Sequence, residues 1–299
     1  MILSFEKCVK AVLLAGLVIG ATRLAEKKTD GFTELAIHSE RDYDIAWETR
    51  PLTENEQVEF DLATSQKYRY FGCGGQAFAL FSEDGKYVIK FFKQRVYRVP
   101  FLLKLIPLPW PLKRYQVKRH WKKSDKLYRD FMSYKMAFEE LQDLTGLIYI
   151  HLNTTQRINR QLMITDKLGQ PHLINLDEVD FVLQKRAEMV HDRINTLMRQ
   201  GAHKEAEEAI TSVLNLVIER AKRGLLDRDP NVRTNCGFID KQAIKVDVGR
   251  FTRDQKAKDP NFFHADLLKI AAPFKTWIAA HHPTLLNHFE KELLRFTHE

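Results

Sequence analysis

Residues 68–94 constrain the fold more than any other stretch, because short apolar runs alternate there with turn residues. The segment reads YRYFGCGGQAFALFSEDGKYVIKFFKQ. The runs are separated by glycines or by a turn pair: Gly72, Gly74, Gly75 and Asp84-Gly85. Such a series is typical of consecutive antiparallel strands joined by tight turns. Lys90 lies inside the most apolar run, YVIKFF, where a lysine is costly unless an anionic group meets it.

Helical periodicity dominates later parts of the chain. Five apolar residues at spacings of four and three predict one face of an amphipathic helix: Leu127, Phe131, Tyr134, Phe138 and Leu141. Residues 161–176 read as two extended stretches around a turn, whereas 188–199 and 204–222 have helical periodicity. The sequence therefore predicts an α+β protein with a sheet-rich first half and a helical second half.

Composition limits the partners only weakly. A chain of 299 residues with 44% hydrophobic residues can bury a substantial core. Its 47 Lys and Arg against 39 Asp and Glu give a net charge of +8, which suits nucleic acid, anionic lipid or phosphorylated ligands. Nucleic-acid motifs are absent, so no nucleic-acid partner is expected. The three cysteines have no metal-ligand spacing and are too few for a disulfide framework.

The N-terminal segment, residues 1–23, contains an apolar stretch from Ala11 to Ala21 between basic flanks. This stretch is shorter than the roughly 20 residues that a membrane span needs. It fits the apolar region of a signal peptide, with Ala21 as a cleavage point, and a short membrane anchor or a buried helix stays open. We expect a membrane-associated or exported protein, with the side of the membrane undetermined.

Two further segments are polar or irregular. Residues 24–67 have weak patterning, which indicates a linker or a loosely packed lead-in. Residues 93–123 read as a basic insertion, and within it 95–123 contains nine Lys or Arg. Four prolines argue against a long regular helix across its middle: Pro100, Pro107, Pro109 and Pro111. A loop over 95–123 that contacts an anionic membrane surface and a loop packed on the domain both stay open.

Residues 224–251, GLLDRDPNVRTNCGFIDKQAIKVDVGRF, place polar side chains beside a hairpin of apolar strands. Asn235 and Asp247 stand at the two ends of the hairpin, and Asp229 lies in the loop before it. A phosphate-transfer site needs donors and a cation for the phosphates, oxygen ligands for Mg²⁺ and a group that orients the acceptor. These side chains, with Lys90 and the glycine-rich turn, supply each of those requirements.

In this order the motifs resemble those of the protein-kinase-like fold, over residues 68–251. Four segments carry the resemblance: Gly72-Cys73-Gly74-Gly75-Gln76-Ala77 is similar to the glycine-rich loop, Val88-Ile89-Lys90 to the strand with the ATP-contacting lysine, Asp227-Arg228-Asp229 to the HRD triplet, and Asp247-Val248-Gly249 to DFG. The resemblance implies a bilobal fold, with a β-rich N-terminal lobe over 68–186 and a reduced helical C-terminal lobe over 187–299.

The resemblance also implies roles for individual residues. ATP and Mg²⁺ are the expected cofactors. Lys90 and Asp229 are the expected catalytic residues, and Asn235 and Asp247 the metal ligands. The expected nucleotide-binding residues are Gly72, Gly74, Gly75, Lys90 and Glu139. Asp130 is the alternative to Glu139 as the acidic partner of Lys90.

The chain departs from the family pattern in three places. Asp227 replaces the histidine of the triplet, Asn235 follows Asp229 by six residues instead of five, and 52 residues follow Asp247. Two functions are therefore kept: a phosphotransferase acting on a hydroxyl of an unidentified acceptor, and a catalytically inactive pseudokinase that binds a partner near a membrane.

Overall fold

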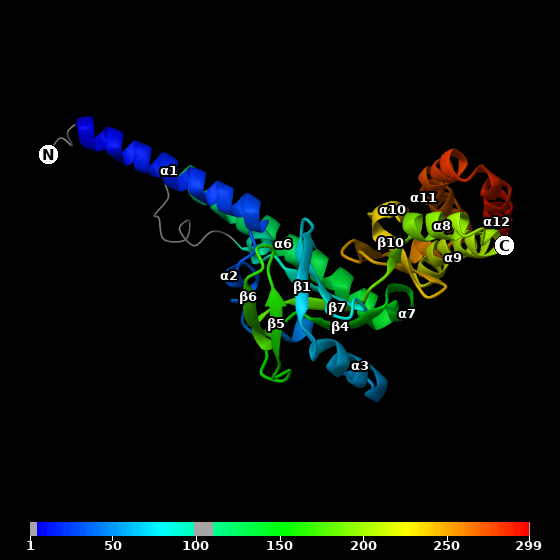
Figure 1. Ribbon diagram of the computed structural model, residues 1–299, viewed down its shortest axis with the longest axis horizontal. Coiled ribbons are helices and arrows are strands. Elements are labelled where there is room, and N and C mark those ends of the chain that lie inside the picture. Colours follow the sequence, from blue (N-terminus) through cyan, green and yellow to red (C-terminus); the bar gives the residue numbers. More distant parts are fainter. Residues whose placement is uncertain (1–4, 99–109, 299) are drawn as a thin grey trace.

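The computed structural model describes residues 5–98 and 110–298 (Figure 1). Within these residues, seven strands form one sheet in the spatial order β4-β7-β3-β2-β1-β5-β6. Their bounds are β1 Tyr68–Cys73, β2 Ala77–Ser82, β3 Tyr87–Phe92, β4 Leu147–His151, β5 Gln161–Thr165, β6 Pro171–Asn175 and β7 Phe181–Lys185. Neighbouring strands are antiparallel except β1 and β5, which pair in parallel. The sheet predicted from residues 68–94 is confirmed as its β1-β2-β3 portion.

The long helix α6 (Trp110–Glu140) packs across the sheet with the predicted apolar face. Phe131 and Phe138 are fully buried. The ring of Phe92, at the end of β3, lies 5.3 Å from that of Phe131 and 5.0 Å from that of Tyr134. These ring contacts fix α6 against the strand that carries Lys90.

Helices dominate the second half of the chain and gather at the opposite end from helix α1 (Figure 1). They are α8 Val190–Arg199, α9 His203–Lys222, α10 Val232–Asn235, α11 Pro260–His281 and α12 Leu286–His298. Short strands lie among them: β8 Glu188–Met189, β9 Leu225–Asp227, β10 Cys236–Ile239, β11 Gln242–Lys245 and β12 Phe251–Arg253. Strand β10 pairs with both β11 and β8, whereas β9 pairs with β12. The α+β organisation predicted from the sequence is confirmed.

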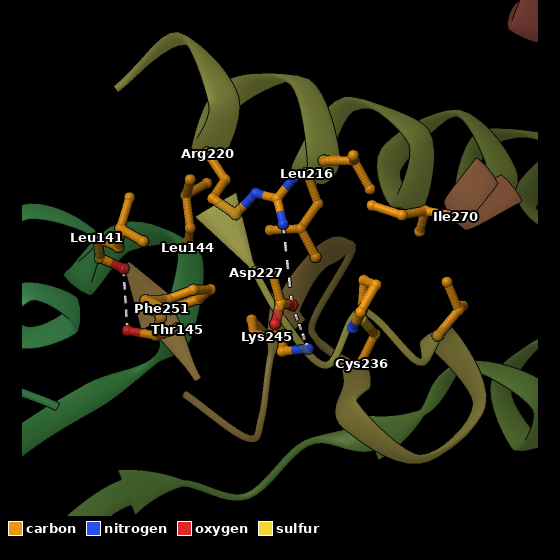
Figure 2. A pocket seen from close by; sticks show the side chains of 13 residues that line it. Leu141, Leu144, Thr145, Leu216, Arg220, Asp227, Cys236, Lys245, Phe251 and Ile270 are labelled. Atoms are coloured by element: carbon orange, nitrogen blue, oxygen red, sulfur yellow. Dashed lines mark hydrogen bonds and ion pairs between the residues drawn. The ribbon is translucent and has the colours of Figure 1, made fainter. Parts of the chain in front are cut away.

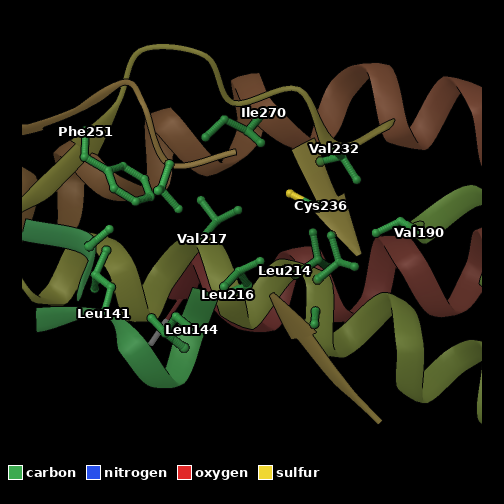
Figure 3. Close-up of a cluster of buried hydrophobic side chains, with 14 of the residues drawn as sticks. Leu141, Leu144, Val190, Leu214, Leu216, Val217, Val232, Cys236, Phe251 and Ile270 are labelled. Carbon is green, nitrogen blue, oxygen red and sulfur yellow. The ribbon is translucent and has the colours of Figure 1, made fainter. Parts of the chain in front are cut away.

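A single buried cluster joins these helices to the preceding part of the chain. Figure 3 shows Leu144 of α7 (Gln142–Thr145), Val217 of α9, Phe251 of β12 and Ile270 of α11 converging on one volume. These elements are distant in sequence, so the loop between β9 and α10, which carries Asp229, is held by a common core.

Residues 24–67 form structured elements instead of the expected linker. They contribute α2 (Glu34–Ile37), the 3-10 turn η1 (Ile45–Trp47) and α3 (Glu54–Thr64). Apolar side chains from this segment enter the core: Phe32, Ile37, Trp47, Phe60 and Ala63. A few buried aromatic side chains suffice to anchor a segment whose overall composition is polar, and this is why its patterning looked weak.

Helix α1 (Phe5–Thr29) is one continuous helix that extends away from the rest of the molecule (Figure 1). Residues 1–4 of the expected signal or anchor segment lie outside the described residues. Among the helices that the structure describes, none is long and apolar enough to cross a membrane.

The basic segment is largely helical rather than a loop. A short helix, α4 (Gln94–Tyr97), precedes residues 99–109, which lie outside the described residues together with Pro100, Pro107 and Pro109. Helix α6 then begins at Trp110, so the expectation of a loop is wrong from that residue onward. Pro111 occupies the first turn of α6, where a backbone N–H has no partner within the helix, and proline is therefore tolerated there.

The remaining 3-10 turns connect the larger elements. They are η2 Leu176–Glu178, η3 Gln255–Lys258 and η4 Pro283–Leu285.

Candidate functional site

Lys90 lies in the middle of the sheet, on β3, between β2 and β7. Its Nζ donates hydrogen bonds to Gln184 Oε1 at 3.0 Å and to the carbonyl oxygen of Val246 at 2.8 Å. Burial lowers the pKa of Lys90, and the carboxylate of Asp247 partly opposes this shift. A buried amine whose direct partners are a neutral amide and a carbonyl is well suited to meet an additional anion.

The β10-β11 hairpin brings the two expected metal ligands next to this lysine. Cys236 pairs with Lys245 at the open end of the hairpin, and the Val246 N–H donates to the Asn235 carbonyl at 2.8 Å. Asn235 therefore faces Val246, whose carbonyl accepts from Lys90, and Asp247 is the next residue along the chain. The structure thus brings Lys90, Asn235 and Asp247 together from positions distant in sequence.

Asn235 and Asp247 have different surroundings. The Asn235 side chain is buried and its Nδ2 donates to the carbonyl oxygen of Asp229 at 2.9 Å. Asp247 is exposed, and its Oδ1 accepts from the Gly249 N–H at 3.2 Å. An amide oxygen and a carboxylate are hard ligands of the kind that Mg²⁺ takes, with water and phosphate oxygens completing its coordination. Among the described residues, no group of three or more His, Cys, Asp or Glu could hold a metal by itself.

Asp229 lies in the loop between β9 and α10 and is exposed to solvent. Its carbonyl oxygen is the shared acceptor for Asn235 and for Lys245, which donates at 2.7 Å. The exposed side chain is free to meet a molecule that arrives from solvent, while the backbone that carries it is held.

The glycine-rich turn connects β1 to β2 over the same region. A side chain added at Gly72, Gly74 or Gly75 would meet nothing within 4 Å, so the backbone is open there. A Cβ at Gly249 would lie 2.8 Å from Gln76 Oε1, which places the end of this turn against the Asp247-Val248-Gly249 segment. Lys93 reaches back to the turn, and its Nζ donates to the Gly74 carbonyl at 2.7 Å.

The expected pairing of Glu139 with Lys90 is wrong. The ion pair of Glu139 is with Lys135, one helical turn earlier, at 4.0 Å. The alternative, Asp130, accepts from Lys126 at 2.7 Å and from the Tyr97 hydroxyl at 3.1 Å. Neither acid hydrogen-bonds to Lys90, because α6 presents other residues to the segment Asp247-Val248-Gly249.

Ser133 of α6 hydrogen-bonds to the residues that follow Asp247, and the neighbouring Tyr134 ring lies close to Gly249. The Ser133 hydroxyl donates to the Val248 carbonyl and accepts from the Phe251 N–H at 2.6 Å. A serine within an amphipathic helix carries no sequence signal for such a role, so sequence reasoning did not find it.

Two other residues beside the candidate site could have been identified from the sequence. Gln184 is a buried polar residue inside the apolar strand β7, and Lys245 is a buried lysine inside the apolar run of β11. Both residues share the feature that marks Lys90 in the sequence, which is a polar side chain within an apolar strand.

Comparison with known proteins yields similarity at the level of fold. The bifunctional kinase-methyltransferase WbdD is similar with a TM-score of 0.35 and 14% identity, over 73% of this chain and 43% of WbdD. The ROP18 kinase domain in complex with AMP-PNP and sucrose is similar with a TM-score of 0.34 and 14% identity, over 62% of this chain and 51% of that one. ROP2 from Toxoplasma gondii is described as having a protein-kinase fold and no enzymatic activity. It is similar with a TM-score of 0.32 and 11% identity, over 77% of this chain and 65% of ROP2.

The chain spans less than half of WbdD, and no residue role is taken from any of these proteins. No protein-family model matches the sequence, and neither does any curated protein. The order of strands and helices and the meeting of Lys90, Asn235 and Asp247 within this chain itself agree with the kinase-like resemblance of its motifs.

Proposed function

We propose that this kinase-like chain is an ATP- and Mg²⁺-dependent phosphotransferase that acts on a hydroxyl of an unidentified acceptor. One observation supports the proposal above all others: the Lys90 amine donates to the carbonyl oxygen of Val246. Val246 directly precedes Asp247, and its N–H donates to the Asn235 carbonyl. A cation and two oxygen ligands next to an open glycine turn match what a metal-bound triphosphate needs.

Each residue then has a distinct task. Lys90 binds the nucleotide phosphates, and the backbone at Gly72, Gly74 and Gly75 approaches them without side chains in the way. Asn235 and Asp247 hold Mg²⁺, which when bound neutralises phosphate charge. Asp229 orients the acceptor hydroxyl and accepts its proton.

A second candidate is a pseudokinase that binds a partner without turnover. The observation in its favour is that, among the residues that the structure describes, no carboxylate hydrogen-bonds to Lys90, whose partners are the Gln184 amide oxygen and the Val246 carbonyl. An amine held by neutral groups stays in place without nucleotide, as a structural lysine does.

Thermal unfolding of the full chain, titrated with Mg²⁺ and ATP, separates nucleotide binding from its absence. At 100 times the dissociation constant, binding to the native state adds about 2.7 kcal/mol, and so the melting temperature rises by several degrees. Lys90→Ala and Asp247→Ala abolish most of the rise, whereas Lys86→Ala, at the exposed turn before β3, keeps it. A wild type with no rise contradicts the proposal, and a rise without ADP release favours the pseudokinase.

We also propose that the protein attaches to an anionic membrane surface through α1 and the first half of α6. The aliphatic side chains of α1 are unusually exposed, with Leu13 at 67% and Leu17 at 70%. On α6, Trp121 is 67% exposed within a run of basic residues that includes Lys118 and Lys122. Exposed apolar and aromatic groups next to basic ones fit the interface of an anionic bilayer.

The two helices meet a common residue. Arg95 lies 3.6 Å from Glu26 of α1, and Lys123 of α6 donates to its carbonyl at 2.6 Å. Sedimentation with vesicles therefore tests them together. We expect binding to vesicles that contain phosphatidylglycerol, weaker binding to phosphatidylcholine alone and loss at high salt.

Variants assign that binding to the two helices. Leu14→Glu with Leu17→Glu, and Lys118→Glu with Lys122→Glu, should each release the protein from anionic vesicles. Lys204→Glu with Lys256→Glu makes the same charge change on exposed residues elsewhere and should not. Equal loss in this control contradicts a defined membrane face.

A further inference from the structure

Lys245 and Asp227 form an ion pair beneath the loop that carries Asp229. Lys245 Nζ lies 2.5 Å from Asp227 Oδ2, and the two side chains are only 6% and 4% exposed. Figure 2 shows the pair in the wall of a cavity lined by apolar side chains, among them Leu144, Leu216 and Phe251. Removing two charges from water costs desolvation free energy. The attraction between Lys245 and Asp227, together with their further hydrogen bonds, has to offset that cost.

Both members of the pair also bind the backbone of Asp229. Lys245 Nζ donates to the Asp229 carbonyl at 2.7 Å, and the Asp229 N–H donates to Asp227 Oδ1 at 2.8 Å. Asn235 adds a second donor to the same carbonyl at 2.9 Å. The peptide groups on either side of this residue are therefore fixed by three side chains from β9, α10 and β11.

A second ion pair continues this network into the helical core. Arg220 of α9 lies 3.9 Å from Asp227 and 2.8 Å from Asp266 of α11. Its Nε has no hydrogen-bond partner within the described structure although it is buried. Two cations and two carboxylates thus balance in charge around the oxygens that accept from Lys245 and from the Asp229 N–H.

We propose that Asp227 and Lys245 act as positioning residues that fix Asp229 relative to the metal ligands, an inference that rests on the proposed function. The loop from Asp229 to Asn235 is one residue longer than the family pattern, and added length increases the freedom of a loop. Lys245 offsets that freedom because it lies on β11, two residues before Asp247. The backbone of Asp229 is thereby held by the end of β11, the strand that leads directly to Asp247.

If Asp227 and Lys245 position Asp229, substitutions at these two residues should slow turnover without weakening nucleotide binding. Neither Asp227 nor Lys245 is a group that the proposed function places on the nucleotide. Removing the pair therefore leaves the dissociation constant for Mg²⁺ and ATP within about twofold. Hydrolysis of ATP to ADP and inorganic phosphate, with water as the phosphoryl acceptor, slows by roughly 10- to 100-fold, because misorientation affects the transfer step.

Three variants of the full chain test this separation. Lys245→Met removes the nearer of the two cations beside Asp227, and Asp227→Asn removes the carboxylate that pairs with the buried Lys245, so both lower the melting temperature. The double variant removes both charges and melts above either single variant, yet its turnover stays slow. Lys241→Met, at the exposed turn of the same hairpin, is the matched control and changes neither quantity.

Amide hydrogen exchange at Asp229 gives a readout that needs no acceptor. The wild-type amide should exchange at least 10-fold more slowly than in Asp227→Ala, because the Asp227 carboxylate accepts from it and alanine has no side-chain acceptor. Unchanged exchange, or a double variant with wild-type turnover, overturns the positioning role. A wild type that binds no nucleotide overturns the proposed function and the positioning role with it, whatever the exchange rate.

Discussion

Glycine at residue 237 is required by packing, in contrast to the glycines of the β1-β2 turn. A Cβ at Gly237 would lie 2.8 Å from both the Ala187 Cβ and the Glu188 carbonyl oxygen. The residue therefore permits β10 to lie directly against β8, the segment that joins the two halves of the molecule. At Gly74, by contrast, the added atom would meet nothing within 4 Å.

Gly237→Ala should thus lower the free energy of unfolding by about 1–3 kcal/mol, since part of the obstruction is backbone that cannot rotate away. Gly74→Ala is the matched substitution and should leave that free energy within about 0.5 kcal/mol of wild type. Urea denaturation measures both. Equal effects of the two substitutions would contradict the packing at β10.

The sequence located some site residues and missed others for identifiable reasons. Lys90, Asn235 and Asp247 were found because each stands out within or beside an apolar strand. Glu139 was assigned wrongly, since helical periodicity shows which face of α6 is buried without showing which residue reaches Lys90 or the segment Asp247-Val248-Gly249. The contact made by Ser133 depends on how α6 lies against β12, which is information absent from any local pattern.

Among the elements, α3 depends on one charged side chain at its N-terminus. The Thr53 hydroxyl accepts from the Glu56 N–H, and the Glu56 side chain accepts from the Thr53 N–H at 2.7 Å. Arg50 pairs with the same carboxylate at 2.5 Å and donates to Gln142 at 2.6 Å. The capping of α3 is thereby linked to α7.

This arrangement makes part of the stability dependent on pH. The hydrogen bond from Arg50 lowers the pKa of Glu56 from 4.5 to about 2. A carboxyl group with a lowered folded-state pKa contributes stability that is fully present above pH 4.5 and is lost as the pH falls toward 2. Glu56→Gln keeps a side-chain oxygen that can accept from the Thr53 N–H but loses the charge that pairs with Arg50, and it should cost about 1–2 kcal/mol at pH 7.

The difference between wild type and Glu56→Gln should shrink as the pH falls through that window, as measured by urea unfolding at several pH values. Glu54→Gln, at an exposed position in the same helical turn, is the control and should cost less than half as much at pH 7. A difference that stays constant down to pH 2 would contradict the stabilising ion pair between Arg50 and Glu56.

Helix α6 shows where element prediction succeeds and where it fails. Its apolar face over 127–141 was predicted correctly because the periodicity reports burial directly. Its start was missed, since Pro111 was taken as an interruption when it instead occupies the first turn. The parallel pairing of β1 with β5 was likewise beyond prediction, because nothing local in either strand specifies it.

At the scale of the molecule, the sheet and the helical half meet at the candidate site. Lys90 from the sheet donates to Val246 of the second half, and β8 pairs with β10 just after the last strand of the sheet. The order of strands and helices was predictable from periodicity. The distance between Lys90 and the hairpin was not, because it is set by how the sheet packs on the second half.

Calorimetric titration with AMP-PNP, in the presence and absence of Mg²⁺, tests the central claim that Lys90 and Asp247 act in one nucleotide site. If they do, Asp247→Asn weakens binding only when Mg²⁺ is present, whereas Lys90→Met weakens it in both conditions. Nucleotide binding that is equally strong in wild type and both variants, with or without Mg²⁺, would contradict the account.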